Sequence, residues 1–288
     1  MHLHLTTSTI SALVAGVMLW LVGSDRVMAQ DAHCRATLVT GVESIEPGVP
    51  FLAAVSFEME EGWHIYWRNP GDAGLATSIA WNLPNGFTVD PLGWPVPHLF
   101  GEPPEVTYGY SGSVVLPVRI TPPSRLVPGS RIELSARVDW LVCRDACVPG
   151  RATVAAQLPV EASHRDNVAA MKQIEHAVAS APAPVRPSFM TAMASEEGYT
   201  IRIADRNGSP GASPTFLPYF ESVIDHSAAQ RVEKVTGATL IHLAASPFAT
   251  GRAARLQGIL VQMDGSHPAD GTRALEVDLE VESSGGTP

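Results

Sequence analysis

Two cysteines four residues apart, Cys143 and Cys147, are the residues of this sequence best suited to carry chemistry. Paired thiols can form and break a disulfide by thiolate attack, which is the basis of thiol–disulfide exchange. Four residues of a straight strand span about 13 Å, whereas bridged Cα atoms lie within roughly 7 Å, so a bond between the two requires that the strand has ended in a turn. We expect the Pro149-Gly150 pair to allow that reversal.

The cysteine pair has two interpretations. A bridge that closes a loop of about five residues removes only some 2 kcal/mol of unfolded-state entropy, against roughly 4.7 kcal/mol for a hundred-residue loop. A disulfide that stabilises the fold so little is easier to explain as a redox couple. The alternative is a permanently oxidised bridge that pins a loop, and the spacing does not decide between them. Arg144 would favour a neighbouring thiolate and Asp145 would oppose it, so local charge also leaves both open.

Position in the sequence predicts which sulfur reacts first. Cys143 follows the buried face of an expected strand, so its sulfur should be sheltered, while Cys147 should lie nearer solvent. A thiolate must be accessible to attack or be attacked, so we expect Cys147 to form mixed disulfides with partners and Cys143 to resolve them. Cys34 is expected before the first strand, near a mobile terminus and outside the exchange couple.

The elements around the pair read as short strands separated by turn signals. The clearest strand, Arg131 to Val142, alternates regularly and leads directly to Cys143. Further expected strands are Ala36–Val42, Phe51–Met59, Thr77–Trp81, Ser113–Ile120, Ala152–Leu158, Tyr199–Ala204, Ala238–Ala244, Arg255–Met263 and Arg273–Val281. This spacing predicts an all-β chain of two β-sandwiches.

Between the two groups of strands the pattern changes. Residues 163–180 have helical spacing with a Ser candidate for the cap, and a Pro-rich piece follows at 181–187. We therefore divide the chain into a signal peptide at 1–29, a redox-active sandwich at 30–160 that carries the cysteine pair, a connector at 161–187, a second sandwich at 188–282 and a disordered tail at 283–288.

The first residues and the charge balance limit the function classes. Leu13 to Gly23 is an apolar run of about eleven residues, which suits a signal peptide cleaved near Ala29 and is too short to span a bilayer. Export to the periplasm without stable membrane insertion is therefore expected. The net charge of −10, with 19 scattered Lys and Arg residues, makes nucleic acid an unlikely partner because no basic patch is present.

No cofactor or metal is expected. The histidines are far apart in sequence and lack ligand spacing, and the sequence has no phosphate loop, catalytic triad or paired-carboxylate motif.

Several motifs in combination resemble the N-terminal periplasmic region of the DsbD and ScsB family of disulfide reductases. They are the run from Trp63 to Gly74 (WHIYWRNPGDAG), Tyr108-Gly109-Tyr110, Val115-Leu116-Pro117-Val118, the segment Trp140 to Gly150, Phe216-Leu217-Pro218 and the run from Ile224 to Gln230. The match extends from Gly41 to about Val281. The resemblance implies immunoglobulin-like sandwiches that take electrons from a membrane partner and pass them to periplasmic thiol–disulfide proteins.

The resemblance also assigns residues. It makes Cys143 and Cys147 the exchanging pair, places His64 and Tyr66 among aromatics that line the site, and puts Phe100 in a flexible cap loop. Full-length family members continue into a membrane domain, so for a chain that stops at Pro288 we expect a separately encoded membrane electron donor. The alternative function is a non-catalytic periplasmic protein-binding module with a structural disulfide, linked through the ScsB branch to copper tolerance.

Overall fold

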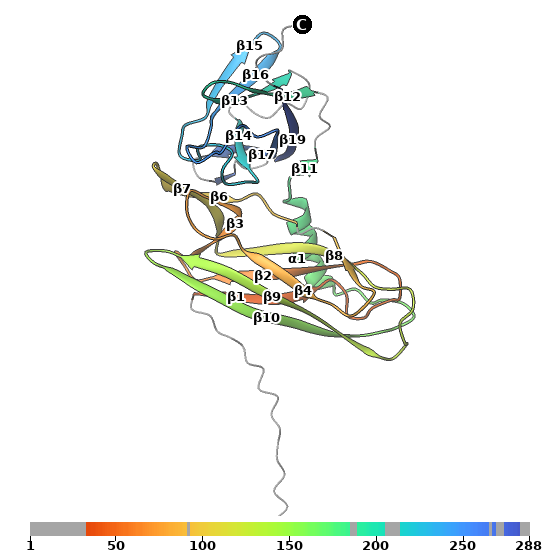
Figure 1. Ribbon diagram of the computed structural model, residues 1–288. Coiled ribbons are helices and arrows are strands. Elements are labelled where there is room, and N and C mark those ends of the chain that lie inside the picture. The colour runs from red at the N-terminus through yellow and green to blue at the C-terminus, as the bar shows by residue number, and fades with distance from the viewer. Residues whose placement is uncertain are drawn as a thin grey trace, which may run out of the picture.

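A computed structural model describes residues 33–90, 93–184, 189–204, 214–264, 267–268 and 274–282. Two β-rich bodies are stacked end to end, with one helix alongside the first (Figure 1). Within these ranges no helix is both long and apolar enough to cross a membrane. The expected signal peptide, its cleavage site at Ala29, the tail at 283–288 and part of the Pro-rich piece lie outside the described residues.

The N-terminal sandwich has two antiparallel sheets. One has the strand order β1-β2-β8-β5, and the other has the order β10-β9-β3-β7-β6 with β4 paired to β9. Their bounds are β1 (Cys34–Thr40), β2 (Phe51–Met59), β3 (His64–Gly71), β4 (Ser78–Asn82), β5 (Thr88–Val89), β6 (His98–Glu102), β7 (Glu105–Ser111), β8 (Ser113–Thr121), β9 (Arg131–Cys143) and β10 (Cys147–Pro159).

Alternation along the strands builds the core between the two sheets. In β9 the side chains of Leu134, Ala136, Val138 and Trp140 are all buried, which confirms the face predicted from the sequence. Across the sandwich, Phe57 of β2 meets Trp140 edge-on, with ring centroids 5.7 Å apart. The β-sandwich expected from strand spacing, and the immunoglobulin-like class that the family resemblance implies, are therefore present.

The C-terminal sandwich is built from two half-sheets. β14-β17-β19 forms one and β12-β13-β16-β15 the other, and a short parallel pairing of β12 with β19 joins them. Their apolar faces share one core, in which Ile201 and Ile241 meet Leu260 and Leu279. The bounds are β11 (Ala183–Pro184), β12 (Met190–Ala194), β13 (Gly198–Ala204), β14 (Pro214–Pro218), β15 (Arg231–Val235), β16 (Ala238–Ala244), β17 (Arg255–Asp264), β18 (His267–Pro268) and β19 (Leu275–Glu282).

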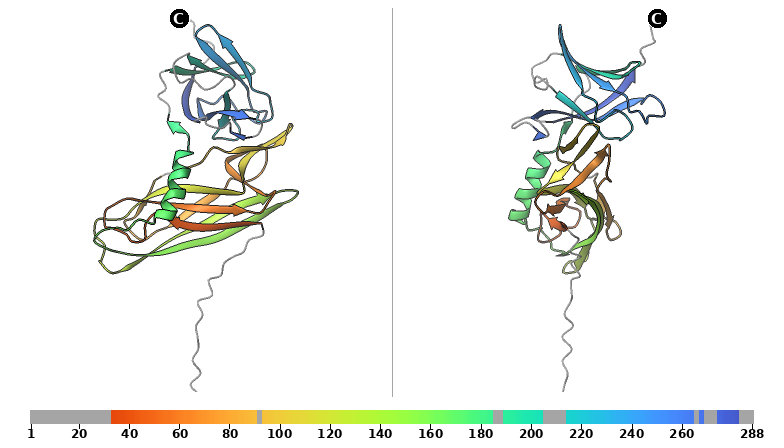
Figure 2. Two further views of the ribbon diagram at one scale, coloured as in Figure 1. Left: turned by 180° about the vertical axis from the view of Figure 1, so that it is seen from behind. Right: turned by 90° about the vertical axis from the view of Figure 1, so that its left-hand side faces the viewer.

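Helix α1 (Val168–Ala179) lies in the connector, against the N-terminal sandwich (Figure 2). Its N-cap is Asn167, whose side chain accepts a hydrogen bond from the Ala170 amide, and not the Ser expected from the sequence. The helix buries Ala170 and Ile174, whereas Val168 is 78% exposed. Met171 of the helix packs against Gly41, where a Cβ would collide with its sulfur.

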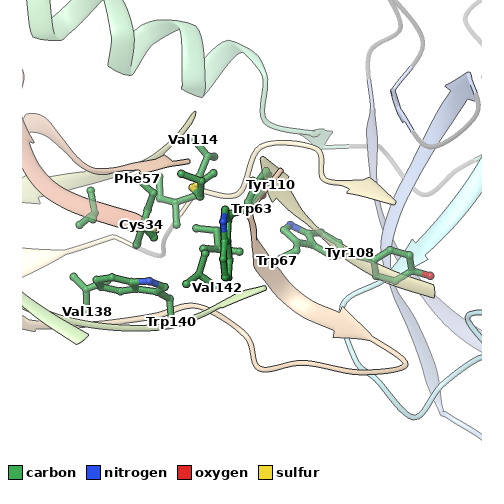
Figure 3. Packing of buried hydrophobic residues seen from close by; sticks show 14 of the residues in the cluster. Cys34, Phe57, Trp63, Trp67, Tyr108, Tyr110, Val114, Val138, Trp140 and Val142 are labelled. Carbon is green, nitrogen blue, oxygen red and sulfur yellow. The ribbon is translucent and has the colours of Figure 1, made fainter. Parts of the chain in front are cut away.

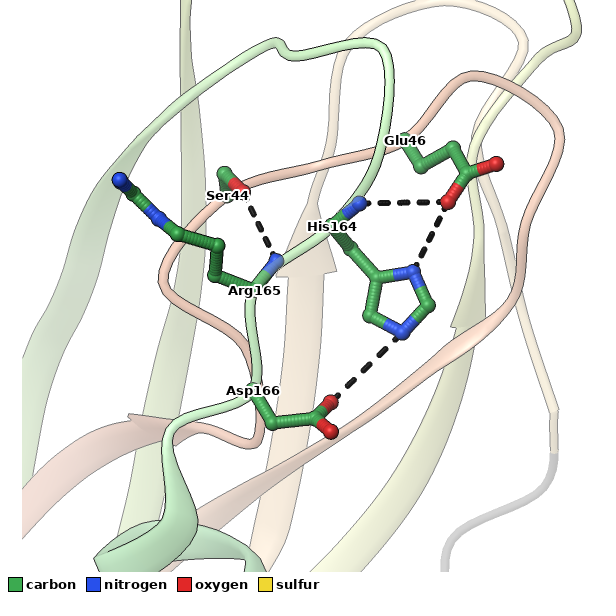
Figure 4. Close-up of polar contacts among 5 residues, drawn as sticks. All are labelled: Ser44, Glu46, His164, Arg165 and Asp166. Carbon is green, nitrogen blue, oxygen red and sulfur yellow. Dashed lines mark hydrogen bonds and ion pairs between the residues drawn. The ribbon is translucent and has the colours of Figure 1, made fainter.

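The segment before α1 is attached to the N-terminal sandwich by a polar cluster (Figure 4). His164 donates from its amide, at 3.2 Å, and from Nδ1, at 2.9 Å, to the Glu46 carboxylate. Its Nε2 lies 3.6 Å from Asp166, and the Arg165 amide donates to Ser44 Oγ. The hydrogen bonds from His164 lower the pKa of Glu46. The cluster fixes where the connector leaves the sandwich.

The two sandwiches are in direct contact. Trp67 of β3 and Tyr108 of β7 belong to a hydrophobic cluster that also contains Leu217 and Ile259 of the C-terminal sandwich. Figure 3 shows Trp63, Trp67 and Tyr108 in succession from the N-terminal core towards that sandwich. The fully buried Asn69 donates from Nδ2 to the Pro218 carbonyl at 2.8 Å. Contacts with the C-terminal sandwich therefore help to fix the positions of strands β3 and β7.

Candidate functional site

Cys143 and Cys147 form a disulfide at the tip of the β9–β10 hairpin. The two residues are the last opposed pair of the two strands, and their Cα atoms lie 4.2 Å apart. The chain therefore reverses within residues 144–146. The prediction that Pro149-Gly150 makes the turn is wrong, because both residues lie inside β10. Gly150 serves close packing instead, since a Cβ there would lie 2.3 Å from the Trp140 indole.

The two sulfurs differ in exposure. Cys143 is buried, with 2% of its surface exposed, whereas Cys147 is exposed. The difference follows from the hairpin, because Cys143 ends a strand whose alternate side chains enter the core while Cys147 begins the outer strand β10. The expected difference in exposure between the two cysteines is confirmed. An attacking thiolate therefore reaches Cys147 more easily.

Tyr66 is the side chain in direct polar contact with the disulfide. Its hydroxyl donates to Cys143 Sγ at 3.1 Å and lies 3.8 Å from Cys147 Sγ. Burial, and secondarily the charge of Glu105, raise the pKa of Tyr66, so the phenol stays protonated and remains a donor. This donor is placed to stabilise negative charge on the Cys143 sulfur when the bridge opens.

The ring of Tyr66 is fixed by the loop that follows β3. A Cβ on Gly74 would lie 2.3 Å from the ring, so only glycine permits this approach, and its φ of 104° is also one that glycine adopts readily. Thr77 Oγ1 donates to the Tyr66 carbonyl at 2.9 Å. The loop therefore holds both ends of the tyrosine.

His64 and Phe100 form a second aromatic layer next to the disulfide. His64 lies opposite Cys143 in the β3–β9 register, and its ring stacks on Phe100 with centroids 4.3 Å apart. It also meets Tyr66 edge-on at 5.3 Å. Burial lowers the pKa of His64, so the neutral imidazole is favoured. Phe100 lies within strand β6, where it is partly buried, and not in a loop as expected.

The structure thus brings together all five residues proposed from the sequence. It also adds Arg144, whose guanidinium lies 5.1 Å from the centroid of the Trp63 ring while pairing with Asp145 at 3.1 Å. The aromatic contact of Arg144 could not be predicted from the residues around it, because Trp63 is far away along the chain. This contact anchors the loop between the two cysteines.

Cys34 lies apart from the disulfide, inside the core. It is the first residue of β1, opposite Met59, and only 4% of its surface is exposed. Figure 3 shows it beside Phe57 and Val114. The expectation of a mobile position before the first strand is therefore wrong, because β1 begins at Cys34 itself.

In the described part of the chain, no group of three or more His, Cys, Asp or Glu side chains could hold a metal ion.

Comparison with known proteins gives one family match. Residues 40–159 match the family described as "Thiol:disulfide interchange protein DsbD, N-terminal". This range contains Tyr66, Phe100 and both cysteines of the bridge. No curated protein matches the sequence.

Among solved structures, the N-terminal periplasmic domain of ScsB from Proteus mirabilis is similar over most of the chain. The TM-score is 0.60 at 14% identity, covering 88% of this chain and 96% of that one. Two other solved structures are too distant to support an argument. One is the major pilin subunit BcpA of Bacillus cereus, with a TM-score of 0.29 at 9% identity, covering 86% of this chain and 69% of that one. The other is a family 123 glycoside hydrolase from Clostridium perfringens, with a TM-score of 0.22 at 8% identity, covering 44% of this chain and 27% of that one. The likeness to the ScsB domain shows a common fold.

Proposed function

We propose that this protein is a periplasmic dithiol carrier, because residues 40–159 match the family of DsbD N-terminal thiol:disulfide interchange domains. It takes two electrons from a membrane partner and passes them to exported proteins that contain disulfides. The observation that carries the proposal is the asymmetric bridge, in which an exposed Cys147 is bonded to a buried Cys143 that accepts a hydrogen bond from Tyr66. The periplasmic location is supported by the similarity in fold to the periplasmic domain of ScsB.

Reduction begins when a donor thiolate attacks Cys147 Sγ. The bond between the two sulfurs breaks, a mixed disulfide forms at Cys147, and Cys143 leaves as a thiolate that the Tyr66 hydroxyl stabilises. The second thiol of the donor then attacks the mixed disulfide. The donor leaves oxidised, and this protein holds two thiols.

Delivery runs through the same atoms in the opposite direction. The Cys147 thiolate attacks an acceptor disulfide and forms a mixed disulfide, with one acceptor sulfur leaving as a thiol. Cys143 then attacks Cys147 Sγ, which restores the bridge and releases the second acceptor thiol. Two electrons pass from the dithiol to the acceptor. His64 and Phe100 line the site and restrict which thiols approach Cys147.

The test is to trap the intermediate. Cys143→Ser leaves Cys147 without its resolving partner, so periplasmic extracts of cells expressing this variant should contain mixed disulfides at Cys147 that disappear on reduction. Cys147→Ser is the matched control and should trap far less, because its remaining thiol is buried. If Cys143→Ser traps nothing, the exchange function is refuted and a binding module with a permanently closed bridge is favoured.

A further inference from the structure

A pocket of about 660 Å³ lies where the two sandwiches meet. We call it the junction pocket. The N-terminal sandwich contributes Arg68, Ala76, Thr77 and Trp94 to its walls, and the C-terminal sandwich contributes the segment 219–223. Its volume is in the range of pockets that take a small ligand or a few side chains of a partner.

The cation of the junction pocket is available for a ligand. The Arg68 guanidinium lies 4.0 Å from the centroid of the Tyr219 ring, and the residue is exposed. In the part of the chain that the structure describes, Arg68 makes no ion pair, whereas Arg165 and Arg255 each pair with carboxylates. A guanidinium that lies over an aromatic ring can still direct its N–H donors to a carboxylate.

Two exposed apolar side chains belong to the pocket wall or lie next to it in the sequence. Phe220 of the lining segment is 55% exposed, and Leu75, next to the lining residue Ala76, is 65% exposed. Exposed large apolar side chains that gather around a pocket are typical of a protein interaction site. Glu221 also lines the pocket, so a single acidic group near Arg68 fits better than a highly charged anion.

The pocket and the disulfide are connected through one residue. Thr77 of the pocket wall donates to the Tyr66 carbonyl, and the hydroxyl of the same Tyr66 donates to Cys143 Sγ. The pocket wall and the disulfide are therefore separated by a single residue, Tyr66. The walls are also held in place, because Asn69 bonds the Pro218 carbonyl and the Tyr108 hydroxyl lies 3.1 Å from His226 Nδ1.

We propose that the junction pocket receives an acidic segment with an apolar neighbour from the protein that exchanges disulfides with Cys147. Arg68 pairs with the carboxylate, while Phe220 and Leu75 pack on the apolar side chain. The C-terminal sandwich thereby selects and orients the partner for attack at the bridge. This inference rests on the proposed exchange function and adds to it the chemistry of the partner.

Synthetic peptides test the pairing directly. Each peptide carries one cysteine as a mixed disulfide with thionitrobenzoate, a Gly-Ser spacer of varied length, and a terminal Glu-Phe or Gln-Phe segment. The reduced full-length protein transfers two electrons to this disulfide, which releases the coloured thionitrobenzoate and the peptide thiol. Stopped-flow absorbance gives the second-order rate constant for each peptide.

For the wild-type protein we expect the Glu-Phe peptide of the best spacer to react on the order of tenfold faster than its Gln-Phe twin, as a hydrogen-bonded ion pair would give. Arg68→Gln should bring that ratio close to one, and Glu221→Gln should raise it. Phe248→Ser, at a site 83% exposed elsewhere on the C-terminal sandwich, should keep the wild-type ratio.

An equal rate for the two wild-type peptides at every spacer length, or an unaltered ratio in Arg68→Gln, would overturn the proposed pairing. Hydroxyethyl disulfide, a small neutral substrate, separates this failure from failure of the proposed function. If the wild-type dithiol reduces neither hydroxyethyl disulfide nor any peptide, the exchange function fails. If it reduces hydroxyethyl disulfide but ignores the Glu-Phe segment, only the junction pocket assignment fails.

Discussion

Replacing Tyr66 with Phe removes the hydroxyl that donates to Cys143 Sγ at 3.1 Å and leaves the buried ring in place. A hydrogen bond to a charged group contributes about 1.5–3 kcal/mol. This donor meets a full negative charge only after the bridge is reduced and Cys143 is a thiolate. Since 1.36 kcal/mol corresponds to one pKa unit, Tyr66→Phe should raise the pKa of the Cys143 thiol by about one to two units.

The same energy should appear in the redox equilibrium. Loss of the donor destabilises the reduced protein at pH values above the thiol pKa, so the reduction potential should fall by roughly 30–60 mV there. At lower pH both thiols are protonated, and the difference between variant and wild type should shrink. The potential difference should therefore grow as the pH rises.

Ultraviolet absorbance of the thiolate, followed through a pH titration of the reduced protein, measures the pKa. Equilibration with glutathione at several pH values measures the potential. A Cys34→Ala background removes the third thiol from the titration. Tyr199→Phe is the matched control, because that hydroxyl lies in the C-terminal core and accepts from the Ala253 amide. An unchanged Cys143 pKa in Tyr66→Phe, or an equal shift in the control, would refute the role given to the hydroxyl.

Three further predictions concern the same site. Reduced protein treated with a bulky maleimide should be labelled at Cys147 before Cys143, as read by peptide mapping, and faster labelling at Cys143 would reverse the assigned order of attack. Phe100→Ala should speed reduction of the bridge by dithiothreitol severalfold because it removes the ring stacked on His64; an unchanged rate would show that the ring is no barrier. Burial lowers the pKa of His64 from 6.5, so the unfolded state binds more protons below that pH, and the free energy of unfolding in urea should fall as the pH drops below about 6.5. His64→Gln should flatten this fall, and an equally steep fall in the variant would contradict the assignment to His64.

Strands in which apolar and polar residues alternate were predictable from the sequence, because a strand with one buried face has apolar side chains at every second position. The expected range Phe51–Met59 coincides with β2, and the expected Arg131–Val142 ends one residue before β9 does. Strand β3, which carries His64 and Tyr66, and its neighbour β7 were not found in this way. β3 is buried on nearly all its residues and contains Asn69 and Pro70, and β7 has Gly109 at its centre, so neither shows an alternating pattern.

The geometry of the site depended on contacts that sequence spacing does not encode. The turn between the cysteines has neither Gly nor Pro, so the chain reversal was predicted too far along the sequence, at Pro149-Gly150. Gly109 is needed in β7 because a Cβ would lie 2.2 Å from the Ile65 carbonyl of β3, a contact that only the folded sheet creates. Residues such as Tyr66 were nevertheless identified, through the family resemblance of the surrounding motif.

The position of the bridge explains how a disulfide can open without loss of the fold. Closing a five-residue loop contributes only about 2 kcal/mol in the chain-entropy model. The hairpin below the bridge is held by the paired strands from Val142–Val148 to Arg131–Pro159, and Val142 and Trp140 anchor it in the core. Tyr66 is positioned to donate a hydrogen bond to a Cys143 thiolate. Its own position is fixed by Gly74 and Thr77 and not by the bridge. The reduced and oxidised forms therefore share one scaffold, so the free energy of the couple is set mainly by the few groups around the sulfurs.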